Sequence, residues 1–252
     1  MNDLEGQIAL VTGSSRGIGA AIATLFAAEG AVVVVHGRDA DAVAAVAAQI
    51  EKTGGRAVPA IADLTDYGQI EAMREAVERE AGPVDVVVAN AGGSPVRPGP
   101  VEEISEADWR RSVDVNLMAT FLTIKAFLPG MKRRQHGNLI TMSSAAARRP
   151  TPMSPVAYAA AKAGIELLTR DVAAQAGPFG VRANCIAPET ILTERNRAQI
   201  PPDVQDQLRD HHPLRRLGLP EDVAQAALFL ASEQSSWITG ITVDVAGGAV
   251  LA

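Results

Sequence analysis

Cysteine is almost absent from this sequence of 252 residues, which contains a single one, Cys185. One cysteine excludes an internal disulfide, and its place in the apolar run 181–187 predicts a buried thiol that packs as a small hydrophobic group. The chain has no apolar run approaching ~18 residues, and residues 1–5 are acidic, without an apolar signal region. We therefore expect a soluble cytoplasmic protein with no membrane segment.

Basic charge and aromatic side chains are also scarce. The 23 Lys and Arg residues are outnumbered by 29 Asp and Glu, and the net charge of −6 gives no broad positive field for nucleic acid or an anionic membrane. The densest basic run, 132–134, is predicted to end a helix, where cations interact favourably with the helix dipole; docking of an acidic partner is the alternative. The adjacent His211 and His212 point in different directions on a helix or strand and have no third ligand nearby, so no metal site is expected.

What the sequence has in abundance is an alternation of short apolar runs with amphipathic helical patterns. The runs predicted as strands are 8–11, 31–35, 57–61, 84–89, 139–142, 181–186 and 241–243. A first helix ends at Gly30, and further helices are predicted at 40–52, 66–81, 106–132, 157–175 and 220–232. This alternation predicts an α/β fold, a doubly wound Rossmann-type parallel sheet with helices on both faces, in one domain spanning 1–252. Ligands of such sheets bind beyond the carboxyl ends of the strands.

A glycine-rich turn, residues 12–19, joins the first strand to the first helix. Its glycines allow a tight turn and close approach of the backbone to a pyrophosphate, and the helix N-terminus offers N–H donors. The position after the first strand predicts dinucleotide binding. The spacing Gly-x-x-x-Gly-x-Gly differs from Gly-x-Gly-x-x-Gly and points to a particular subfamily.

The end of the second strand carries the signal for the choice of cofactor. An NAD site places a carboxylate here for the ribose 2′-OH, whereas an NADP site places an arginine for the 2′-phosphate. Gly37 leaves room where an acid would stand, Arg38 follows it, and Arg16 in the glycine loop can supply a second cation. We expect Asp39 to cap the next helix, and therefore favour NADP(H).

Small polar residues follow the later strands. Asp63 follows the third strand, where its side chain either stabilises a turn or helix end or belongs to the cofactor site. Residues 90–93, Asn-Ala-Gly-Gly, form a small-residue turn after the fourth strand, where a flat ring or a ribose can pass. Asn116 lies near the apolar stripe of a long helix, so it is either a structural hydrogen-bonding group or part of a polar relay. Ser143 and Ser144 end the fifth strand.

Tyr158 and Lys162 are four residues apart on a predicted helix, and so share one face of it. A fixed ammonium group favours the phenolate and draws the phenol pKa toward neutrality, where a general acid/base works best. An ordinary exposed Tyr and Lys on an amphipathic helix would have the same spacing. The pair therefore indicates catalysis only together with the other motifs of the chain.

These motifs resemble, in order and spacing, those of the short-chain dehydrogenase/reductase superfamily in its compact form. The matching motifs are the glycine loop 12–19, Asp63-Leu64, Asn90-Ala91-Gly92, Asn116, Ser144 and Tyr158-x-x-x-Lys162, followed by the segment Pro188, Thr190, Ile191 and Thr193. Residues 216–218, 220–224, 238–240 and 247–248 resemble the C-terminal third of the family. The resemblance covers essentially the whole chain and is greatest to bacterial 3-oxoacyl-[acyl-carrier-protein] reductases.

The resemblance implies roles for four catalytic residues. Tyr158 would be the acid/base that protonates the substrate oxygen, and Lys162 would lower the tyrosine pKa and hold the nicotinamide ribose. Ser144, rather than Ser143, would hydrogen-bond the substrate carbonyl, and Asn116 would hold a water that continues a proton relay. The implied cofactor-binding residues are Gly13, Ser15, Arg16, Gly17, Ile18, Gly19, Arg38, Asp63, Leu64, Asn90, Ala91, Gly92, Tyr158, Lys162, Pro188, Thr190, Ile191 and Thr193.

Three features depart from the pattern of the relatives. Glu189 follows Pro188 where Pro-Gly is usual, and glycine, unlike glutamate, adopts φ > 0 at little cost, which allows a reshaped loop. Its carboxylate either selects substrate near the nicotinamide or turns to solvent. Arg148 and Arg149, in the loop 148–152 that borders the substrate pocket in relatives, either meet an acidic substrate or are exposed. The turn 177–180 lacks the basic residue often present in relatives that dock a carrier protein.

The sequence therefore predicts an NADP(H)-dependent reductase that transfers a hydride to a carbonyl, such as that of a 3-oxoacyl thioester, with a mobile lid at about 190–215. By resemblance we expect a homotetramer. The alternatives are an NAD(H)-linked alcohol, sugar or steroid dehydrogenase of the same superfamily, and a nucleotide-binding regulator without catalysis. The trio Ser144, Tyr158 and Lys162 argues against the regulator, which would not need it.

Overall fold

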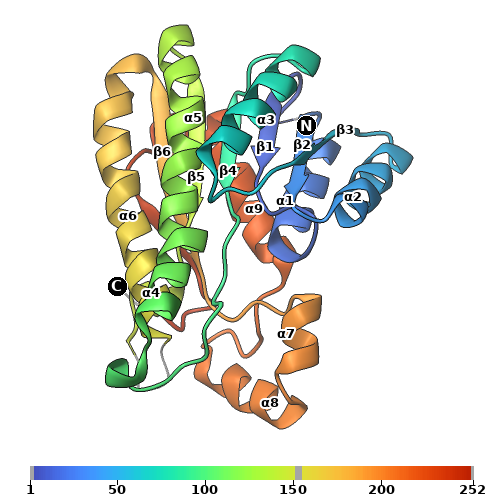
Figure 1. Cartoon of the computed structure of the whole chain (residues 1–252). Coiled ribbons are helices and arrows are strands. Elements are labelled where there is room, and N and C mark those ends of the chain that lie inside the picture. Colours follow the sequence, from blue (N-terminus) through green and yellow to red (C-terminus); the bar gives the residue numbers. More distant parts are fainter. Residues whose placement is uncertain (1–2, 151–154, 251–252) are drawn as a thin grey trace.

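The computed structural model describes residues 3–150 and 155–250, and its centre is a parallel sheet of seven strands in the order β3-β2-β1-β4-β5-β6-β7 (Figure 1). The strands are β1 Ile8–Val11, β2 Val32–Gly37, β3 Arg56–Ile61, β4 Val86–Ala89, β5 Gly137–Met142, β6 Val181–Pro188 and β7 Thr242–Val245. Every neighbouring pair is parallel. The predicted doubly wound sheet is thus confirmed, and each predicted strand lies within a few residues of its observed position.

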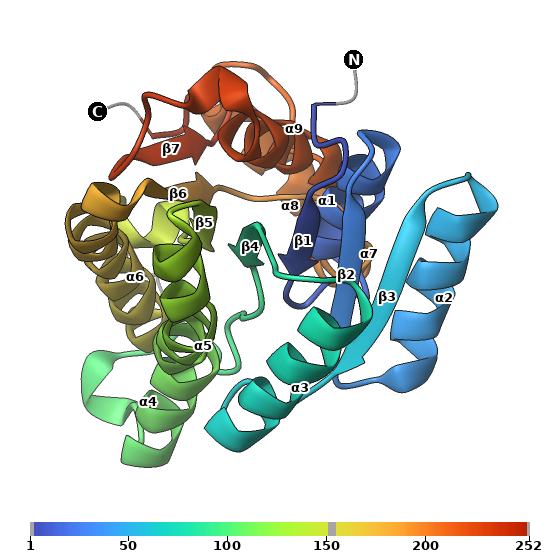
Figure 2. The same cartoon turned by 90° about the horizontal axis from the view of Figure 1, so that it is seen from above.

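Helices cover both faces of the sheet. They are α1 Gly17–Ala28, α2 Ala40–Lys52, α3 Tyr67–Glu80, α4 Glu106–Val113, α5 Ala119–Arg134, α6 Val156–Ala176, α7 Glu194–Gln199, α8 Pro202–His211 and α9 Pro220–Ala231. Two separate apolar cores result: one beneath α1, α2 and α9, and the other beneath α3, α5 and α6 (Figure 2). β1, β2, β4 and β5 are buried along their whole length, because helices pack on both of their faces.

Side-chain caps explain where several helices begin. Asp39 accepts a hydrogen bond from the Ala42 N–H at the start of α2, as the sequence predicted. Asp66 caps α3, and Ser105 caps α4 in the same way. The basic run 132–134 forms the last turn of α5, as expected, and there Arg134 also donates to the Val84 carbonyl at 2.7 Å.

The helix predicted at 106–132 is interrupted. A π-helical turn, Asp114–Met118, separates α4 from α5, and Asn116 is fully buried within it. A π-turn shifts the helical repeat by only one residue, and apolar residues on one helix face recur at spacings of either three or four, so the sequence pattern does not reveal it. Such turns often occur at functional sites.

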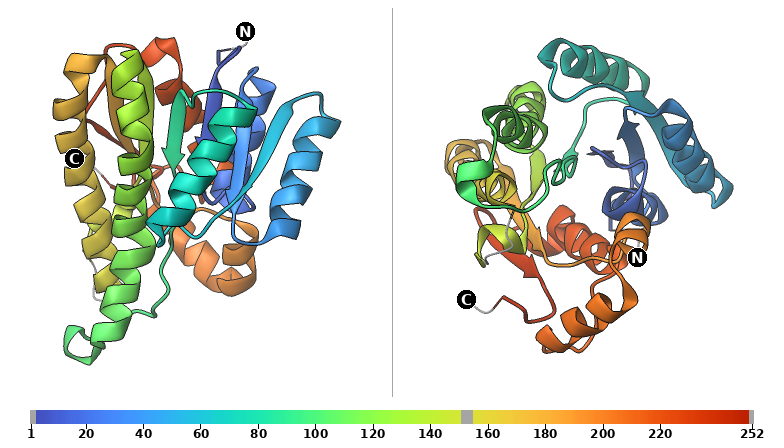
Figure 3. Two further views of the ribbon diagram at one scale, coloured as in Figure 1. Left: turned by 45° about the horizontal axis from the view of Figure 1, so that its top comes forward. Right: turned by 60° about the horizontal axis from the view of Figure 1, so that its bottom comes forward.

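The strand order reverses between β1 and β4, which makes their carboxyl ends the topological switch point. At this edge of the sheet α7 and α8, which we call the cap, lie beside the ends of the strands (Figures 1 and 3). In the described part of the chain, no helix combines the length and the apolar character needed to cross a membrane.

Candidate active site

The glycine loop and the turn after β4 are in direct contact at the switch point. The Asn90 amide donates to the carbonyl oxygens of Thr12 at 2.9 Å and Gly13 at 3.3 Å. Gly13 has φ +64°, and a Cβ placed there would lie 2.9 Å from the Ala91 Cα, so the close approach requires glycine. The Ala91 N–H in turn donates to the Thr12 hydroxyl at 3.0 Å. Thr12 begins the motif, but its residue type gave no sign of this structural role.

The N-terminus of α1 has the chemistry of an anion site. The side chain of its N-cap residue, Arg16, accepts no hydrogen bond from the helix, and the first turn contains no acidic residue. The N–H groups of that turn are therefore available to an anion. Gly17 has φ +57°, and a Cβ there would lie 3.2 Å from the Thr193 Cγ2. The glycine loop therefore reaches the segment that follows β6. These features fit a dinucleotide, with its pyrophosphate at this helix end.

The predicted 2′-phosphate region contains both arginines, each beside a carboxylate. Arg16 pairs with Asp39 at 3.1 Å, and Arg38 lies 4.0 Å from Asp63; the Arg38 side chain is 76% exposed. Asp63 also accepts hydrogen bonds from the Thr65 N–H and hydroxyl, and these hold the pKa of its carboxyl below the usual value. Asp63 thus forms the local turn that the sequence allowed, and its second oxygen faces Arg38.

His36 at the end of β2 is a buried residue of this region that the sequence analysis did not single out. The Gly13 N–H donates to its Nδ1 at 3.1 Å, and its Nε2 lies 3.2 Å from the Ala62 carbonyl oxygen. Burial lowers the pKa of His36 to about 4, so the ring is neutral at pH 7, with its proton on Nε2. The ring connects the glycine loop to the end of β3. A polar residue closing a run of four valines is the signal that sequence reasoning could have used.

The catalytic candidates meet beyond the ends of β4 and β5. The Ser144 hydroxyl lies close enough to the Tyr158 phenol to lower its pKa, and the ammonium group of Lys162 lies 5.5 Å from the centre of the Tyr158 ring. Ser144 also begins a short 3-10 turn, Ala145–Ala147, by accepting from the Ala146 N–H. The structure therefore brings together the three residues that the sequence grouped.

Burial is the largest influence on the pKa of Tyr158 and of Lys162. Burial raises the pKa of the Tyr158 phenol, and the hydrogen bond with Ser144 lowers it to a smaller extent. Lys162 is 3% exposed and donates to the Met142 carbonyl at 2.7 Å, and burial lowers its pKa to about 8. The ammonium group is directed to a main-chain carbonyl here, and the expectation that it lowers the tyrosine pKa stays a prediction.

Ser143 and Ser144 have different surroundings. The Ser143 hydroxyl is buried and lies 2.8 Å from Glu166 Oε1 and 3.2 Å from the Lys162 carbonyl oxygen, which ties the end of β5 to α6. Arg148 lies between Glu166 at 3.9 Å and Asp244 at 3.5 Å. Of the two alternatives for Arg148, full exposure does not describe the structure, because these carboxylates hold a partly buried side chain. Arg149 is exposed and donates to the Ala249 carbonyl, while residues 151–152 of the same loop lie outside the described residues.

Asn116 shapes the turn after β4. Its Oδ1 accepts from the Gly93 N–H at 3.0 Å, and its Nδ2 donates to the carbonyl oxygens of Gly93 and Ser112. A Cβ on Gly92 would lie 2.5 Å from Asn116 Oδ1 and 3.4 Å from Lys162 Nζ. Both amide hydrogens of Asn116 therefore bind protein carbonyls, and the turn they hold lies against Lys162.

The segment after β6 leads from Pro188 into the cap. Thr193 caps α7 through its hydroxyl, and Ile191 is buried and pairs with Gly218. Leu64, after β3, is also buried in the core, so Leu64 and Ile191 can offer a cofactor only their main chains. Ser15 and Ile18 complete the loop: Ser15 contacts Gly37, and Ile18 packs on the core.

Comparison with known proteins supports the arrangement. The family model described as Enoyl-(Acyl carrier protein) reductase matches residues 13–250. The chain is 36% identical over 247 residues to a 7alpha-hydroxysteroid dehydrogenase of Escherichia coli, covering 98% of this chain and 95% of the relative. It is 34% identical over 251 residues to the 3-oxoacyl-[acyl-carrier-protein] reductase FabG of Thermotoga maritima, covering 98% and 99%.

Solved structures agree as well. A 3-oxoacyl-[acyl-carrier protein] reductase with bound NAD from Brucella melitensis matches with a TM-score of 0.92 at 39% identity, over 100% of this chain and 94% of that chain. The span of the family match, the shared sequence and the common fold show that this chain belongs to the short-chain dehydrogenase/reductase superfamily of nicotinamide-dependent oxidoreductases.

Proposed function

We propose that the protein is an NADP(H)-dependent carbonyl reductase, acting on a 3-oxoacyl thioester or a similar ketone. The observation that carries this proposal is the meeting of Ser144, Tyr158 and the buried ammonium group of Lys162 at the carboxyl edge of the sheet. A proton donor and a second hydroxyl at one point suit a carbonyl oxygen that becomes an alcohol. The relatives named as 3-oxoacyl reductases support the choice of substrate.

In the proposed mechanism the bound nicotinamide supplies the hydride. Ser144 donates a hydrogen bond to the substrate carbonyl oxygen and polarises it. Tyr158 gives its phenolic proton to the same oxygen as negative charge develops there. Lys162 stabilises the resulting phenolate with its positive charge, and the turn held by Asn116 keeps the backbone close to that lysine. The neutral Tyr158, with its raised pKa, is in the protonation state that reduction requires.

The preference for NADP(H) rests on the two arginines. Arg38 is largely exposed, and Gly37 before it is packed so tightly that a Cβ would lie 2.9 Å from Val43, which leaves no room for an acidic side chain. A 2′-phosphate between Arg16 and Arg38 would receive charge-assisted hydrogen bonds. Asp39 and Asp63 reduce this positive field, and they are the observation that favours the alternative, an NAD(H)-linked alcohol, sugar or steroid dehydrogenase.

We also propose a cytoplasmic homotetramer. Two sets of large apolar side chains are exposed on different parts of the surface. Trp109, Met118, Phe121 and Leu167 lie along α4, the π-turn, α5 and α6, and Phe229, Trp237 and Ile241 lie on or near α9 and β7. Two self-complementary apolar patches per subunit are what a tetramer with two kinds of two-fold interface needs. Light scattering after size exclusion measures the mass, and Phe121→Glu should reduce it.

The proposed reaction is tested by following the loss of reduced-cofactor absorbance with a β-ketoacyl thioester, using NADPH and NADH in parallel. We expect turnover with NADPH to be at least tenfold more efficient. Arg38→Ala should weaken NADPH binding by tenfold or more and leave NADH binding nearly unchanged, because only NADPH carries the 2′-phosphate. Arg56→Ala, which removes the same charge from an exposed site at the start of β3, is the matched control.

Each failure has a distinct meaning. Equal losses of NADPH and NADH affinity in Arg38→Ala would contradict the 2′-phosphate assignment. Turnover with other ketones but not with the thioester would replace the substrate while keeping the chemistry. Tight NADPH binding without turnover on any ketone, aldehyde or alcohol would favour the non-catalytic nucleotide-binding regulator.

A further inference from the structure

Two carboxylates near the proposed active site are turned inward. Glu189, which stands where the relatives usually have glycine, has a side chain that is 22% exposed, and its Oε2 lies 2.7 Å from the Nε2 of His212. Glu189 is therefore not turned to solvent. The second carboxylate, Glu166 in α6, is 14% exposed and contacts the segment that carries Ser144. No step of the proposed reaction uses Glu166.

Glu166 shares a face of α6 with the two catalytic candidates of that helix. Tyr158, Lys162 and Glu166 follow one another at intervals of four residues, and residues spaced in this way lie one above another on one side of a helix. The Lys162 ammonium group reaches the end of β5 at the Met142 carbonyl, 2.7 Å away. Glu166 reaches it one residue later, where its Oε1 accepts a hydrogen bond from the Ser143 hydroxyl at 2.8 Å. One helix face therefore carries both the proposed proton donor and a carboxylate that holds the strand end.

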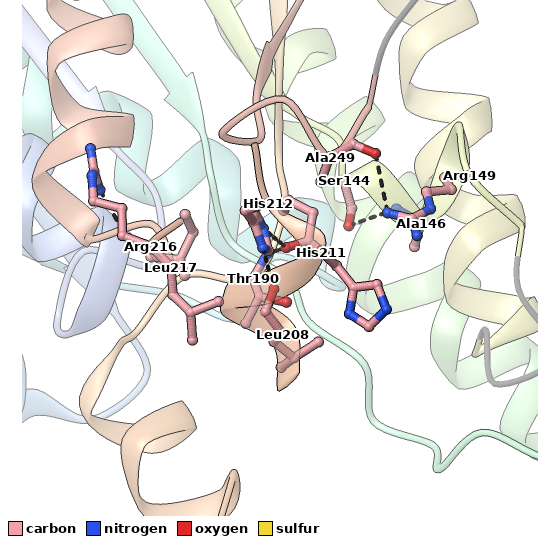
Figure 4. A network of polar contacts seen from close by, with 12 residues as sticks. Ser144, Ala146, Arg149, Thr190, Leu208, His211, His212, Arg216, Leu217 and Ala249 are labelled. Atoms are coloured by element: carbon pink, nitrogen blue, oxygen red, sulfur yellow. Dashed lines mark hydrogen bonds and ion pairs between the residues drawn. The ribbon is translucent and has the colours of Figure 1, made fainter. Parts of the chain in front are cut away.

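The second oxygen of the Glu166 carboxylate contacts the chain on the other side of Ser144. Its Oε2 lies 3.9 Å from a guanidinium nitrogen of Arg148, the residue that follows the short 3-10 turn. Ser144 begins that turn by accepting from the Ala146 N–H at 3.2 Å (Figure 4). One carboxylate thus holds a short segment on both sides of Ser144, through a hydrogen bond at Ser143 and an ion pair at Arg148.

Arg148 is itself held from a second direction. Its Nε lies 3.5 Å from Oδ1 of Asp244 in β7, and both side chains are mostly buried. A guanidinium group between two mostly buried carboxylates has a defined position, because a movement would separate it from both charges. The neighbouring Arg149 differs, since it is exposed and donates to the Ala249 carbonyl at 3.1 Å (Figure 4). Arg148 therefore completes the support of the turn.

We propose that Glu166 is a positioning residue that holds the Ser144 hydroxyl at a fixed place relative to Tyr158. It acts through its contacts with Ser143 and Arg148. The inference rests on the proposed function, in which the hydroxyls of Ser144 and Tyr158 meet the same carbonyl oxygen. Because Glu166 and Tyr158 belong to one helix, the carboxylate ties the Ser144 turn to the helix that carries the proton donor. Without it the turn can move against α6, and a displacement of about 1 Å can lower turnover by about a hundredfold.

Steady-state kinetics with NADPH and a β-ketoacyl thioester measure the effect on turnover. Glu166→Ala should lower kcat by roughly tenfold to a hundredfold, because an interaction made in the transition state is weakened. The dissociation constant for NADPH should stay within about twofold of the wild type, since Glu166 is not among the residues proposed to bind the cofactor. Glu51→Ala, which removes the same side chain from an exposed position in α2, is the matched control and should keep the wild-type kcat.

Variants of Arg148 test the second contact. Arg148→Met should lower kcat about as much as Glu166→Ala, whereas Arg148→Lys should stay within about threefold of the wild type. The contacts at 3.5 and 3.9 Å depend on the charge more than on a two-pronged guanidinium geometry, so an ammonium group can replace it. Equal losses in Arg148→Lys and Arg148→Met would contradict this part of the assignment.

A double-mutant cycle separates positioning of Ser144 from a general loosening of the site. In a Ser144→Ala background, Glu166→Ala should lower kcat by less than about twofold further, because the hydroxyl through which it acts is gone. A further loss as large as that in the wild-type background would refute the inference.

Hydrogen–deuterium exchange tests the support without any turnover. The N–H groups of residues 147–149 bond to main-chain carbonyls within the turn, and they should exchange at least about tenfold faster in Glu166→Ala than in the wild type or Glu51→Ala. If Glu166→Ala does not fold, Glu166→Gln keeps the size and the bond to Ser143, and should match Arg148→Met in exchange and in kcat. Wild-type exchange in these variants would overturn the inference. Faster exchange in a protein that turns over no ketone would reject the proposed reaction but keep Glu166 as the support of the Ser144 turn.

Discussion

Replacing Lys162 with methionine should make the protein more stable at pH 7 while abolishing its turnover. Lys162 is 3% exposed, and burial lowers its pKa from 10.5 to about 8. At about 1.4 kcal/mol per pH unit, keeping this ammonium group charged inside the fold costs about 3.5 kcal/mol. Methionine has a similar length without the charge. It loses the charged hydrogen bond to the Met142 carbonyl, worth about 2 kcal/mol, so a net gain of about 1.5 kcal/mol is expected.

The pH dependence separates this cause from a general packing effect. Because the folded pKa lies below the unfolded one, the unfolded chain binds more protons between pH 8 and 10.5, and the stability of the wild type rises through this range. The wild type should gain about 2.5 kcal/mol from this group between pH 7 and pH 10, whereas Lys162→Met gains nothing from it. The stability advantage of the variant should therefore disappear by pH 10.

Urea unfolding of both proteins at pH 7 and pH 10, followed by circular dichroism, measures the difference. Lys52→Met, at an exposed position in the last turn of α2, controls for the loss of a lysine and should leave stability within about 0.5 kcal/mol of the wild type. A Lys162→Met protein less stable than the wild type at pH 7, or a difference that does not change with pH, would refute the reasoning.

Three further variants test other parts of the site. Tyr158→Phe should reduce turnover by at least a thousandfold and leave NADPH binding, measured by fluorescence, within about twofold; substantial residual activity would reject Tyr158 as the proton donor. His36→Asn should flatten the acid side of the stability profile. The His36 pKa of about 4 lies below its ordinary value of 6.5. Above pH 6.5 this difference contributes about 3 kcal/mol to the stability of the wild type, and the contribution is lost as the pH falls through 4. The variant has no such contribution to lose. Gly19→Ala places a Cβ against the Gly13 carbonyl oxygen and should weaken NADPH binding at least tenfold, while Gly99→Ala, with no atom within 4 Å, should bind normally.

The sequence predicted the sheet because its strands are short apolar runs between capped helices, and such patterns are local. Asp39 is an example: its position before an amphipathic pattern was enough to predict the cap of α2. The trio Ser144, Tyr158 and Lys162 was grouped because a strand end and one helix face determine where these side chains lie. Their roles remain predictions, as does the lid at about 190–215.

Features that depend on contacts between distant segments could not be predicted. The partnership of Glu189 with His212 joins a loop after β6 to the end of α8, and neither residue shows a pattern that indicates the other. His36 is similar, since its two partners lie in the glycine loop and after β3. The Lys162 ammonium group reaches the Met142 carbonyl because of how closely α6 packs against β5, and a sequence pattern does not specify that packing.

The order of the strands in the sheet has a consequence for the synthesis of the chain. β1, β2 and β3 can pair as soon as they emerge, but β4 must then insert beside β1, on the side away from β2. The sheet grows from there in one direction, and β7, near the end of the sequence, is the last strand to be made. Until it arrives, β6 presents an unpaired apolar edge that other chains can join. A chain that stops before Thr242 would keep that edge, and should aggregate or be degraded even though it contains every proposed catalytic residue.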